Sequence, residues 1–382
     1  MVDFELSEEQ KLLKDMAHNF ATNEMLPVAS KYDKEGSFPE EVYRKAYETG
    51  ILDLNVPAEY GGGGAKLLDQ CIVVEELAAA CAGMTTTIIA NYLALQPIII
   101  AGSEEQKKKF LGNFTSSFNI AAFCLTEPTS GSDASNVNVT VRKENGEYIL
   151  NGRKTFISNA PKASLFTVFA TLNKELKHKG ICAFVVPRDA KGVEIGKEED
   201  KLGHRASVTS DVIFNDVHIP EENLLGNEGE GFKVAMMTLD TTRPVIGAMG
   251  TGLARSALEY AADYATKRIA FKQPISNFEA IQFKIADIQK EIEASRLLTW
   301  HAAWLIDHGY KATMESSISK VCSSDTAIHA ALEAIQIYGG YGYSREYPVE
   351  KLLRDAKLLQ IYEGTNEIQR LVIAKEYLSK FR

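Results

Sequence analysis

The residue pattern of this 382-residue chain changes twice, near residues 120 and 230, and these changes constrain its fold more than any other feature. Before residue 120, apolar residues recur at helical spacing, as at Leu12, Leu13, Met16 and Phe20. Between 120 and 230, short β-branched and aromatic runs alternate with turn residues, which is typical of a small barrel or sandwich. Helical spacing then returns. The predicted fold is therefore α+β, mostly α, with an N-terminal helical domain (1–119), a middle β-barrel or sandwich domain (120–230) and a C-terminal helical bundle domain (231–382).

Local patterns within the N-terminal region predict where helices begin and where the chain turns. Ser7 is a candidate helix cap, with Gln10 at the capping-box position three residues later. The Ala-rich segment 73–84, which carries Glu75 and Glu76, is a second predicted helix. The glycine-rich segment 60–64 lacks the Lys-Ser/Thr of a phosphate-binding loop, so we interpret it as a surface turn.

The middle region contains a strong turn signal and several strand-like runs. Asn151 and Gly152 form a pair that favours a tight hairpin, so we expect a turn there between two strands. Further strands are expected at 165–170, 181–186 and 212–214. The region lacks βαβ alternation and a Gly-x-Gly-x-x-Gly run after a strand, which argues against a Rossmann dinucleotide site.

Composition excludes several classes of protein. A net charge of −9 and a pI near 5.5 argue against nucleic-acid binding. The longest purely apolar run, at 98–101, is too short to span a bilayer, so we expect no membrane insertion. The five cysteines lack Cys-x-x-Cys spacing and the seven histidines are scattered, so we expect free thiols and no metal site. Because the N-terminus lacks a targeting pattern, we expect a bacterial cytoplasmic protein or the mature form of a mitochondrial matrix protein.

One carboxylate near the C-terminus is a candidate general base. Glu363 follows the apolar and aromatic run that ends at Tyr362, and it precedes Gly364. A dry, aromatic setting disfavours the charged carboxylate and raises its pKa toward working pH. Such a carboxylate suits removal of a weakly acidic proton from carbon, and Gly364 lets the backbone approach a ligand closely. A helix-end glutamate is the alternative interpretation of this segment alone.

Two segments of the middle region are candidates for binding a polar ligand. The segment 125–133 is rich in hydroxyl and backbone N–H groups, which can bind a polar ring edge or a phosphate. An ordinary Ser/Gly turn is the alternative interpretation of this segment. Downstream, Phe156 and Ser158 lie two residues apart on a predicted strand and therefore on the same face.

These motifs together resemble the acyl-CoA dehydrogenase family, most closely its medium-chain and short-chain branch. The resemblance rests on Leu-Thr-Glu-Pro-x-Ser-Gly-Ser-Asp, Asn-Gly-x-Lys-x-Phe-Ile-Ser-Asn, Tyr-Gly-Gly-Tyr-Gly-Tyr, Arg-Asp-Ala-Lys and Ile-Tyr-Glu-Gly-Thr in that order. It covers essentially the whole chain and implies a four-helix C-terminal domain, FAD as cofactor and a homotetramer. The implied reaction converts an acyl-CoA to a trans-2-enoyl-CoA, with electrons passed to an electron-transferring flavoprotein.

The resemblance also implies roles for individual residues. Glu363 matches the catalytic base, which removes the α-proton while the β-hydrogen leaves as hydride to flavin N5. The residues that match FAD-binding positions are Phe123, Leu125, Thr126, Ser132, Phe156, Ser158, Arg268, Phe271, Gln336, Gly339, Gly340, Thr365 and Glu367. Of these, Arg268, Phe271, Gln336, Gly339 and Gly340 match positions that reach the FAD of a neighbouring subunit. The residues that match substrate-binding positions are Ser132, Asp240, Arg243, Tyr92, Leu95, Tyr362 and Gly364.

Two departures and two alternatives accompany this resemblance. Lys272 replaces the family's usual glycine after Phe271, and Glu279 replaces a glutamine near the expected FAD diphosphate, where it adds like charge. The alternatives are a non-catalytic acyl-CoA-binding scaffold and a flavin oxidase of the same fold. Intact Glu363 and Ser158 argue against the scaffold, and the chain length argues against the oxidase. Bulky Tyr92 and Leu95 favour a short to medium, or a ring-bearing, acyl group.

Overall fold

The computed structural model describes residues 5–381, so the first four residues of the predicted N-terminal domain and Arg382 lie outside the described chain. The helices that precede the sheet are α1 (Glu8–Phe20), a π-helical segment (Ala21–Met25), α2 (Leu26–Glu35), α3 (Glu40–Glu48), α4 (Leu67–Ala101) and α5 (Glu104–Thr115). The predicted capping box is confirmed, because the Gln10 N–H donates to Ser7 Oγ at 3.2 Å and the Ser7 N–H donates to Gln10 Oε1 at 3.1 Å. Segment 60–64 is a turn, as predicted.

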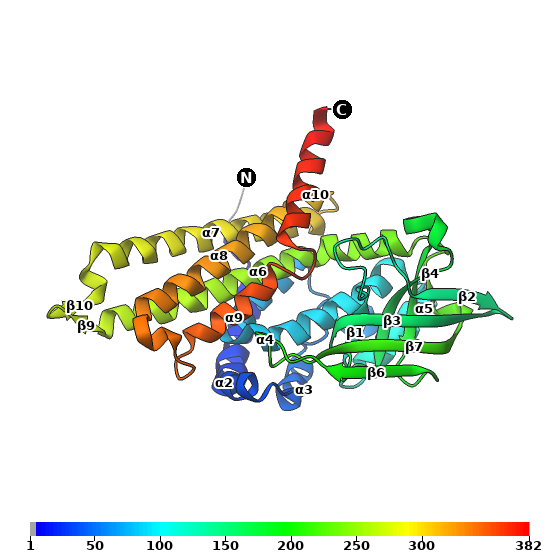
Figure 1. The fold of residues 1–382 in the computed structure, drawn as a ribbon, viewed down its shortest axis with the longest axis horizontal. Coiled ribbons are helices and arrows are strands. Elements are labelled where there is room, and N and C mark those ends of the chain that lie inside the picture. The colour runs from blue at the N-terminus through cyan, green and yellow to red at the C-terminus, as the bar shows by residue number, and fades with distance from the viewer. Residues whose placement is uncertain (1–4, 382) are drawn as a thin grey trace.

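The middle of the chain forms one mixed sheet in the order β6-β7-β3-β2-β4-β5-β8, with β1 pairing with β4. Its strands are β1 (Ala121–Cys124), β2 (Thr140–Glu144), β3 (Glu147–Ser158), β4 (Leu165–Thr171), β5 (Ile181–Pro187), β6 (Val193–Glu198), β7 (Thr209–Pro220) and β8 (Leu224–Leu225). The sheet occupies one end of the molecule (Figure 1). The strands predicted at 165–170, 181–186 and 212–214 are therefore confirmed.

The predicted hairpin turn at Asn151 and Gly152 is wrong. Strand β3 runs straight through both residues, and the turn between β2 and β3 lies instead at the Asn145-Gly146 pair, where both residues have positive φ. Gly152 serves a different purpose: it sits where the β3–β7 register shifts, at φ +136°, and a Cβ there would come within 3.0 Å of Val139. A glycine that permits a bulge and close packing looks the same in sequence as a turn glycine.

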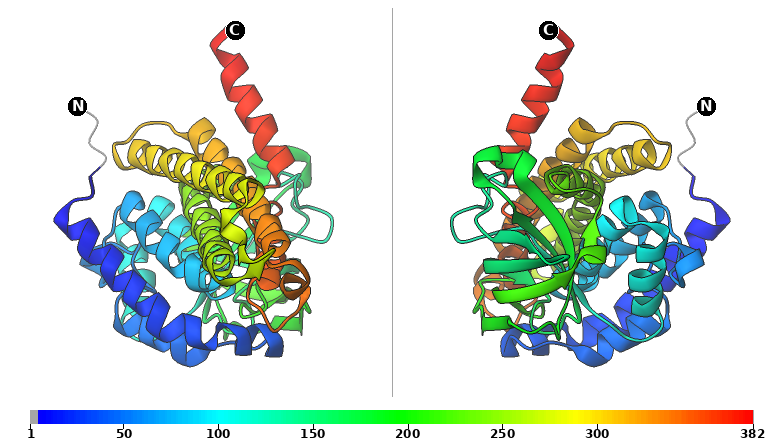
Figure 2. Two further views of the ribbon diagram at one scale, coloured as in Figure 1. Left: turned by 90° about the vertical axis from the view of Figure 1, so that its left-hand side faces the viewer. Right: turned by 90° about the vertical axis from the view of Figure 1, so that its right-hand side faces the viewer.

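After the sheet the chain returns to long helices, which confirms the α+β, mostly α fold class. The elements are α6 (Gly231–Lys267), the short strands β9 (Ile269–Ala270) and β10 (Gln273–Pro274), α7 (Glu279–Asp307), α8 (Thr313–Tyr338), α9 (Val349–Leu359) and α10 (Asn366–Leu378). Helices α6, α7 and α8 lie side by side, with β9 and β10 at the end far from the large sheet (Figure 1). Helix α10 projects away from the body of the molecule in all views (Figure 2).

The largest hydrophobic core is shared by the first and last thirds of the chain. Met25 and Leu77 from the N-terminal helices belong to the same buried cluster as Met249, Leu253 and Ile292 from α6 and α7. Helix α4 is the central element of this core. Within residues 5–381 it is the one helix long and apolar enough to cross a membrane, yet 89% of its apolar window is buried inside the protein. That burial is typical of a core helix.

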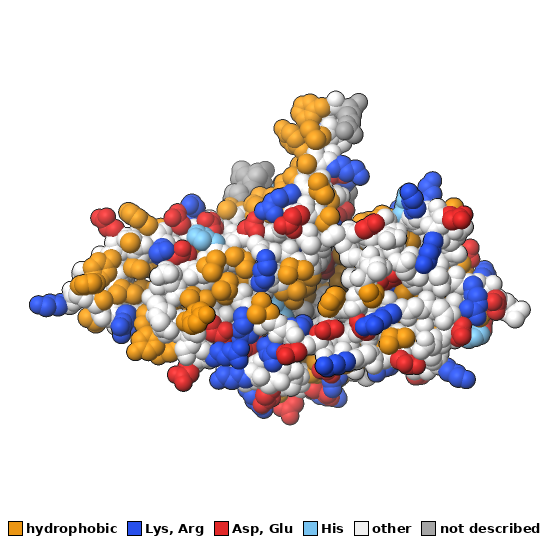
Figure 3. All heavy atoms as spheres, in the orientation of Figure 1, with side chains coloured by type: hydrophobic (Ala, Val, Ile, Leu, Met, Phe, Trp, Pro, Cys, Tyr) orange, Lys and Arg blue, Asp and Glu red, His pale blue; other side chains and the backbone are white. Residues whose placement is uncertain are grey.

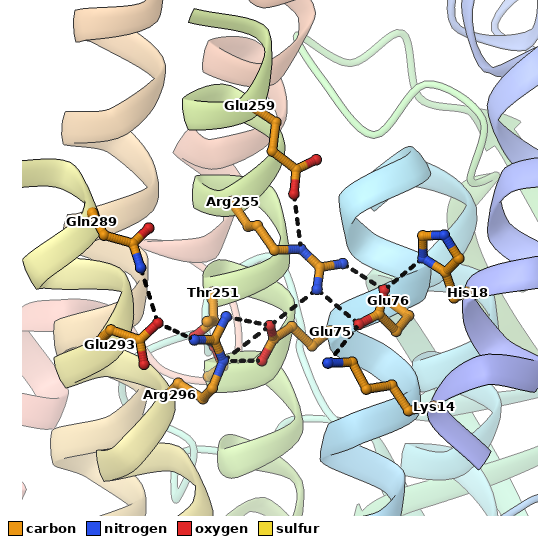
Figure 4. Close-up of polar contacts among 11 residues, drawn as sticks. Lys14, His18, Glu75, Glu76, Thr251, Arg255, Glu259, Gln289, Glu293 and Arg296 are labelled. Atoms are coloured by element: carbon orange, nitrogen blue, oxygen red, sulfur yellow. Dashed lines mark hydrogen bonds and ion pairs between the residues drawn. The ribbon is translucent and has the colours of Figure 1, made fainter. Parts of the chain in front are cut away.

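A buried ion network fastens α1, α4, α6 and α7 together (Figure 4). Glu75 and Glu76 are adjacent on α4 and nearly inaccessible to solvent. Arg255 of α6 makes two 2.7 Å hydrogen bonds to Glu76, and Arg296 of α7 donates to Glu75 at 2.8 Å. His18 of α1 lies 3.1 Å from Glu76. Because a buried charge is tolerated only when it is paired, this network fixes the relative positions of the four helices.

Candidate active site

A cavity of about 400 Å³ opens where the helices meet the sheet. Its wall includes residues from α4, the loop after β1, strand β3, helix α6 and the segment after α9. The predicted site residues that the structure brings together here are Phe123, Leu125, Thr126, Ser132, Phe156, Ser158, Arg243, Tyr362, Glu363 and Gly364. Segments more than 200 residues apart in sequence thus contribute to one concave site, as expected for a ligand pocket.

Glu363 lies in a left-handed turn between α9 and α10. Its φ is +56° and that of Gly364 is +85°. A non-glycine residue with such a backbone is strained, and strain of this kind persists only where surrounding contacts hold it. The main-chain carbonyl of Glu363 accepts hydrogen bonds from Gln369 Nε2 at 3.1 Å and from Arg243 Nε at 3.4 Å. The turn directs the carboxyl group to the cavity rather than along a helix.

The electrostatic setting of Glu363 suits a proton acceptor. Burial raises the pKa of its carboxyl group from the usual 4.5 to about 7, although the Arg243 charge, the Thr242 hydroxyl and the Lys320 charge each oppose the rise. Thr242 Oγ1 donates to Glu363 Oε2 at 3.1 Å. The expected upward shift of the pKa is thus present, and it places the group between its acid and base forms near neutral pH.

The opposite wall of the cavity fits a flat ring with polar edges. Phe156 is 65% exposed although it lies within strand β3, and it is held at φ +54°. The hydroxyl groups of Thr126, Ser132 and Ser158 make no hydrogen bond to any residue in the described part of the chain, so they are free to bind a ligand. An exposed aromatic side chain and unpaired hydroxyl groups that line the same cavity as the carboxylate suit an isoalloxazine ring, which is flat and has polar edges.

A buried ion pair supports this wall from behind. Lys154 is fully buried, and its Nζ donates to Glu127 Oε1 at 2.7 Å and to the Leu125 carbonyl at 2.9 Å. Glu127 also accepts the N–H groups of Asn138 and Val139, at 2.6 and 2.9 Å. The pair therefore fixes both ends of the loop between β1 and β2 relative to β3, and with it the Leu125-Thr126 edge of the cavity.

Two predicted substrate residues do not reach the cavity. Tyr92 and Leu95 are buried on the far side of α4, where the Tyr92 hydroxyl donates to the Ile51 carbonyl. The cavity is lined instead by Ile89, Ala90 and Leu93 of the same helix. Positions 86, 89, 90 and 93 share one helical face, whereas 92 and 95 point about a third of a turn or more away from it. Sequence proximity on a helix is therefore a poor guide to which side chains line a pocket.

The other predicted residues lie outside the cavity. The carboxylate of Asp240 accepts hydrogen bonds from Arg243 Nη1 and from the Thr313 hydroxyl, each at 2.7 Å. Thr365 caps α10, and Glu367 is exposed in its first turn. The ends of α6 and α8 that lie far from the large sheet carry Arg268, Phe271, Gln336, Gly339 and Gly340. Glu279 and Lys272 are exposed there and make no ion pair with each other within residues 5–381.

Several residues at the site were not predicted from the sequence. Thr242, Lys320 and Gln369 all touch the 363–364 turn, but they come from three different helices. Thr242 stands inside the Thr-Thr-Arg-Pro segment beside Arg243, which was the one available sequence signal. Among residues 5–381, no group of three or more His, Cys, Asp or Glu side chains is placed to hold a metal ion.

A buried carboxylate of raised pKa in a cavity lined by an exposed aromatic ring and free hydroxyl groups marks a candidate active site of a kind that suits a flavin-dependent dehydrogenase. Profiles of the acyl-CoA dehydrogenase N-terminal, middle and C-terminal domains match residues 7–117, 122–217 and 229–378. The chain belongs to the acyl-CoA dehydrogenase family. It is accordingly an FAD-dependent oxidoreductase, and homotetramers are typical of the family.

Relatives cover nearly the whole chain. The bovine (Bos taurus) mitochondrial short-chain specific acyl-CoA dehydrogenase is 43% identical over 99% of this chain and 92% of its own length. The structure of butyryl-CoA dehydrogenase from Megasphaera elsdenii has a TM-score of 0.96 and 40% identity, covering 99% of this chain and 100% of that one. A chain in a structure described as the electron transferring flavoprotein of Acidaminococcus fermentans has a TM-score of 0.97 and 41% identity, with the same coverage.

Proposed function

We propose that this chain dehydrogenates a short acyl-CoA thioester to the trans-2-enoyl-CoA, with Glu363 as the general base that removes the α-proton. The observation that carries the proposal is the carboxyl group of Glu363, directed to the cavity with a pKa of about 7. Bound FAD supplies the oxidising power, since a flavin accepts a hydride from the β-carbon. A base with a pKa near the working pH combines a useful fraction of carboxylate with a sufficient affinity for the proton.

The acidity of the α-proton depends on donors to the thioester oxygen. The main-chain N–H of Glu363 donates no hydrogen bond within the described part of the chain, so it is available for that oxygen. A donor aimed at charge that develops in the transition state is typically worth about 3 kcal/mol. The strained turn would thus supply the base and one donor from a single residue.

We assign the cofactor and substrate contacts as follows. Within one chain, Phe123, Leu125, Thr126, Ser132, Phe156 and Ser158 would hold the flavin ring, and Thr365 and Glu367, just outside the cavity, would also contact FAD. Arg268, Phe271, Gln336, Gly339 and Gly340 would bind FAD of a neighbouring subunit in a homotetramer. Arg268 directly follows the last residue of α6 and lies 25 residues (268 − 243) after Arg243, which is roughly 37 Å along the helix, so the two arginines cannot serve one cavity in one chain. Ser132, Asp240, Arg243, Tyr362 and Gly364 remain the proposed substrate contacts.

The acyl chain is proposed to be short. The lining contributed by α4 and α6, including Ile89, Leu93, Leu239 and Ile246, is apolar and bulky. The short-chain relative and butyryl-CoA dehydrogenase support the same assignment. We further propose an electron-transferring flavoprotein as electron acceptor, a bacterial cytoplasmic or mitochondrial matrix location, no membrane insertion, and domain boundaries at 119 and 230.

The test is Glu363→Gln, which preserves size and hydrogen bonding but cannot accept the proton. We expect the purified variant to retain FAD and acyl-CoA binding, while turnover with short, medium and long acyl-CoA substrates falls by about two to four orders of magnitude. The measurement is dye reduction at saturating substrate, with wild type expected to prefer the short chains. Glu59→Gln, at an exposed position, is the matched control. Turnover by Glu363→Gln near the wild-type rate would place the base elsewhere.

A further inference from the structure

The strained turn at Glu363 and Gly364 is held on its far side by a buried lysine. Lys320 lies on α8 with no accessible surface, and its Nζ donates to the Gly364 carbonyl and to Asn366 Oδ1, each at 2.8 Å. The amide nitrogen of Asn366 donates in turn to Ser324 Oγ, one helical turn further along α8, at 2.9 Å. One ammonium group thus connects the exit of the turn to the first residue of α10.

The partners of this lysine do not account for its charge. Within residues 5–381 no carboxylate oxygen lies within 4.0 Å of Lys320 Nζ, and both hydrogen-bond acceptors are neutral. A buried ammonium without an ion-pair partner is costly, and a neutral donor could make the same two bonds. The two hydrogen bonds to the backbone and to Asn366 therefore do not by themselves explain why a charged side chain is buried at this position.

Charged groups from each element packed around Lys320 define its electrostatic surroundings. Glu363 on the turn, Asp325 on α8 and Glu367 on α10 favour its charged form, and Arg243 on α6 opposes it. Helix α7 faces this level of α8 with an uncharged side chain, Thr299, which lies 2.8 Å from Ser319. Among the carboxylates, Glu363 makes the largest contribution to the charged form of Lys320. Lys320 in turn lowers the pKa of Glu363, with a smaller effect than Arg243 and Thr242.

We propose that Lys320 is a positioning residue for the base: its ammonium group fixes the 363–364 turn, and its charge favours the ionised form of Glu363. This inference rests on the proposed function, because it takes Glu363 as the base. Burial lowers the pKa of Lys320 to about 8, so the lysine is charged at the pH where Glu363, with a pKa of about 7, loses its proton. The two groups are therefore oppositely charged between about pH 7 and pH 8.

The experiment measures the pH dependence of kcat and kcat/KM in FAD-saturated Lys320→Met, which removes the charge and both hydrogen bonds. Without the charge, protonated Glu363 is favoured, so we expect the acid limb of the profile to move upward by about one pH unit. Without the hydrogen bonds, we expect kcat on the plateau to fall about ten- to a hundredfold, because the base is misplaced. Affinity for the enoyl-CoA product, followed by flavin absorbance, should change less than kcat.

Two further variants separate the charge from the packing. Lys320→Gln is neutral but keeps an amide donor, so its acid limb should also move upward while its plateau kcat falls less. Lys284→Met is the control, since Lys284 pairs with Glu333 between α7 and α8 away from the turn, and its limb should stay at the wild-type pH. If Lys320→Met does not fold, the limb of Lys320→Gln still decides the proposal.

If a neutral Lys320 variant keeps its acid limb at the wild-type pH, the charge of Lys320 does not favour the ionised form of Glu363. If Lys320→Met keeps the wild-type kcat on the plateau, Lys320 does not position the base. Glu363→Gln is assayed in parallel. If that variant turns over normally, the proposed function fails and the inference fails with it. If Glu363→Gln is inactive while Lys320→Met behaves as wild type, only the role of Lys320 is refuted.

Discussion

The charge that Glu363 carries at neutral pH has a cost for the folded protein. Its pKa is about 7 in the folded chain against an ordinary 4.5, so the folded state binds the proton more tightly than the unfolded state. Stability is therefore full below about pH 4.5 and declines as the pH rises toward 7. At one pKa unit per 1.36 kcal/mol, the loss above pH 7 is about 3 kcal/mol at most.

Glu363→Gln should recover this loss because the amide never ionises. We expect the variant to be more stable than wild type by about 3 kcal/mol at pH 8 but by less than about 1 kcal/mol at pH 5. The measurement is urea unfolding with excess FAD at both pH values. Glu59→Gln should show no pH-dependent gain. An equal gain for Glu363→Gln at both pH values would show that the stabilisation does not come from ionisation.

At this scale the sequence identified the residue but not its surroundings. The raised pKa of Glu363 followed from its apolar and aromatic neighbours, which lie within a few positions of it. Thr242 and Lys320 are 121 residues from Glu363 and 44 residues from Gly364, respectively. No periodicity or motif relates residues at such separations, because the contact is created by helix packing. Neither residue could therefore be assigned to the base in advance.

The loop between β1 and β2 depends on one buried ion pair. Breaking such a pair from one side leaves an uncompensated buried charge, which typically costs about 3–5 kcal/mol. Glu127 also satisfies two backbone N–H groups of this loop, so its displacement would free the Leu125-Thr126 edge that faces the cavity.

Lys154→Met should therefore destabilise the protein by about 3–5 kcal/mol and weaken FAD binding. Adding Glu127→Gln should restore part of the stability because it removes the unpaired buried charge. The recovery should be incomplete, since Glu127 binds the two N–H groups with different oxygens and an amide has only one. Denaturant unfolding and FAD titration of the apoprotein measure the two effects. If the double variant is less stable than the single one, the unpaired charge is not the cause.

Elements were predicted well where periodicity alone defines them and less well where packing decides. The capping box at Ser7 and the strands of the middle region followed from local chemistry. The two Asn-Gly pairs, at 145–146 and 151–152, carry the same local signal, and only the pairing of β3 with β7 distinguishes turn from bulge. The choice of Tyr92 and Leu95 failed for a related reason, because the orientation of α4 about its axis is set by its neighbours.

Large apolar side chains are exposed on the helical part of the single chain. They include Phe283, Leu297, Trp304 and Leu332 on α7 and α8, and Leu371, Tyr377 and Leu378 on α10. Figure 3 shows apolar groups on the projecting α10 and across the helical end. Exposed apolar surface of this extent marks association, which agrees with the homotetramer proposed above.

Arg268→Ala tests whether neighbouring subunits share the FAD sites. Arg268 is exposed at the tip of α6, 5.7 Å from the Tyr341 ring, and it is not part of the cavity lining. We expect the variant to form tetramers yet bind FAD at least tenfold more weakly, since hydrogen bonds to a charged group contribute about 1.5–3 kcal/mol. Light scattering and FAD titration provide the measurements. Lys267→Ala, at the adjacent exposed position, should bind FAD as wild type does. Unchanged affinity in Arg268→Ala would remove this arginine from the site.

The core that joins the first and last thirds of the chain has a consequence for biosynthesis. Helix α4 ends at Ala101, but its main packing partner α6 begins only at Gly231. At about 5–20 residues per second, a ribosome needs roughly 6 to 26 seconds to make the intervening segment. During that interval the most apolar helix of the protein lacks its main packing partner, although α1 and the π-helical segment that also contact it have already been made. The apolar surface of α4 that later packs on α6 is therefore exposed in the nascent chain. Holding chaperones have their greatest opportunity to bind before the last third of the chain is synthesised.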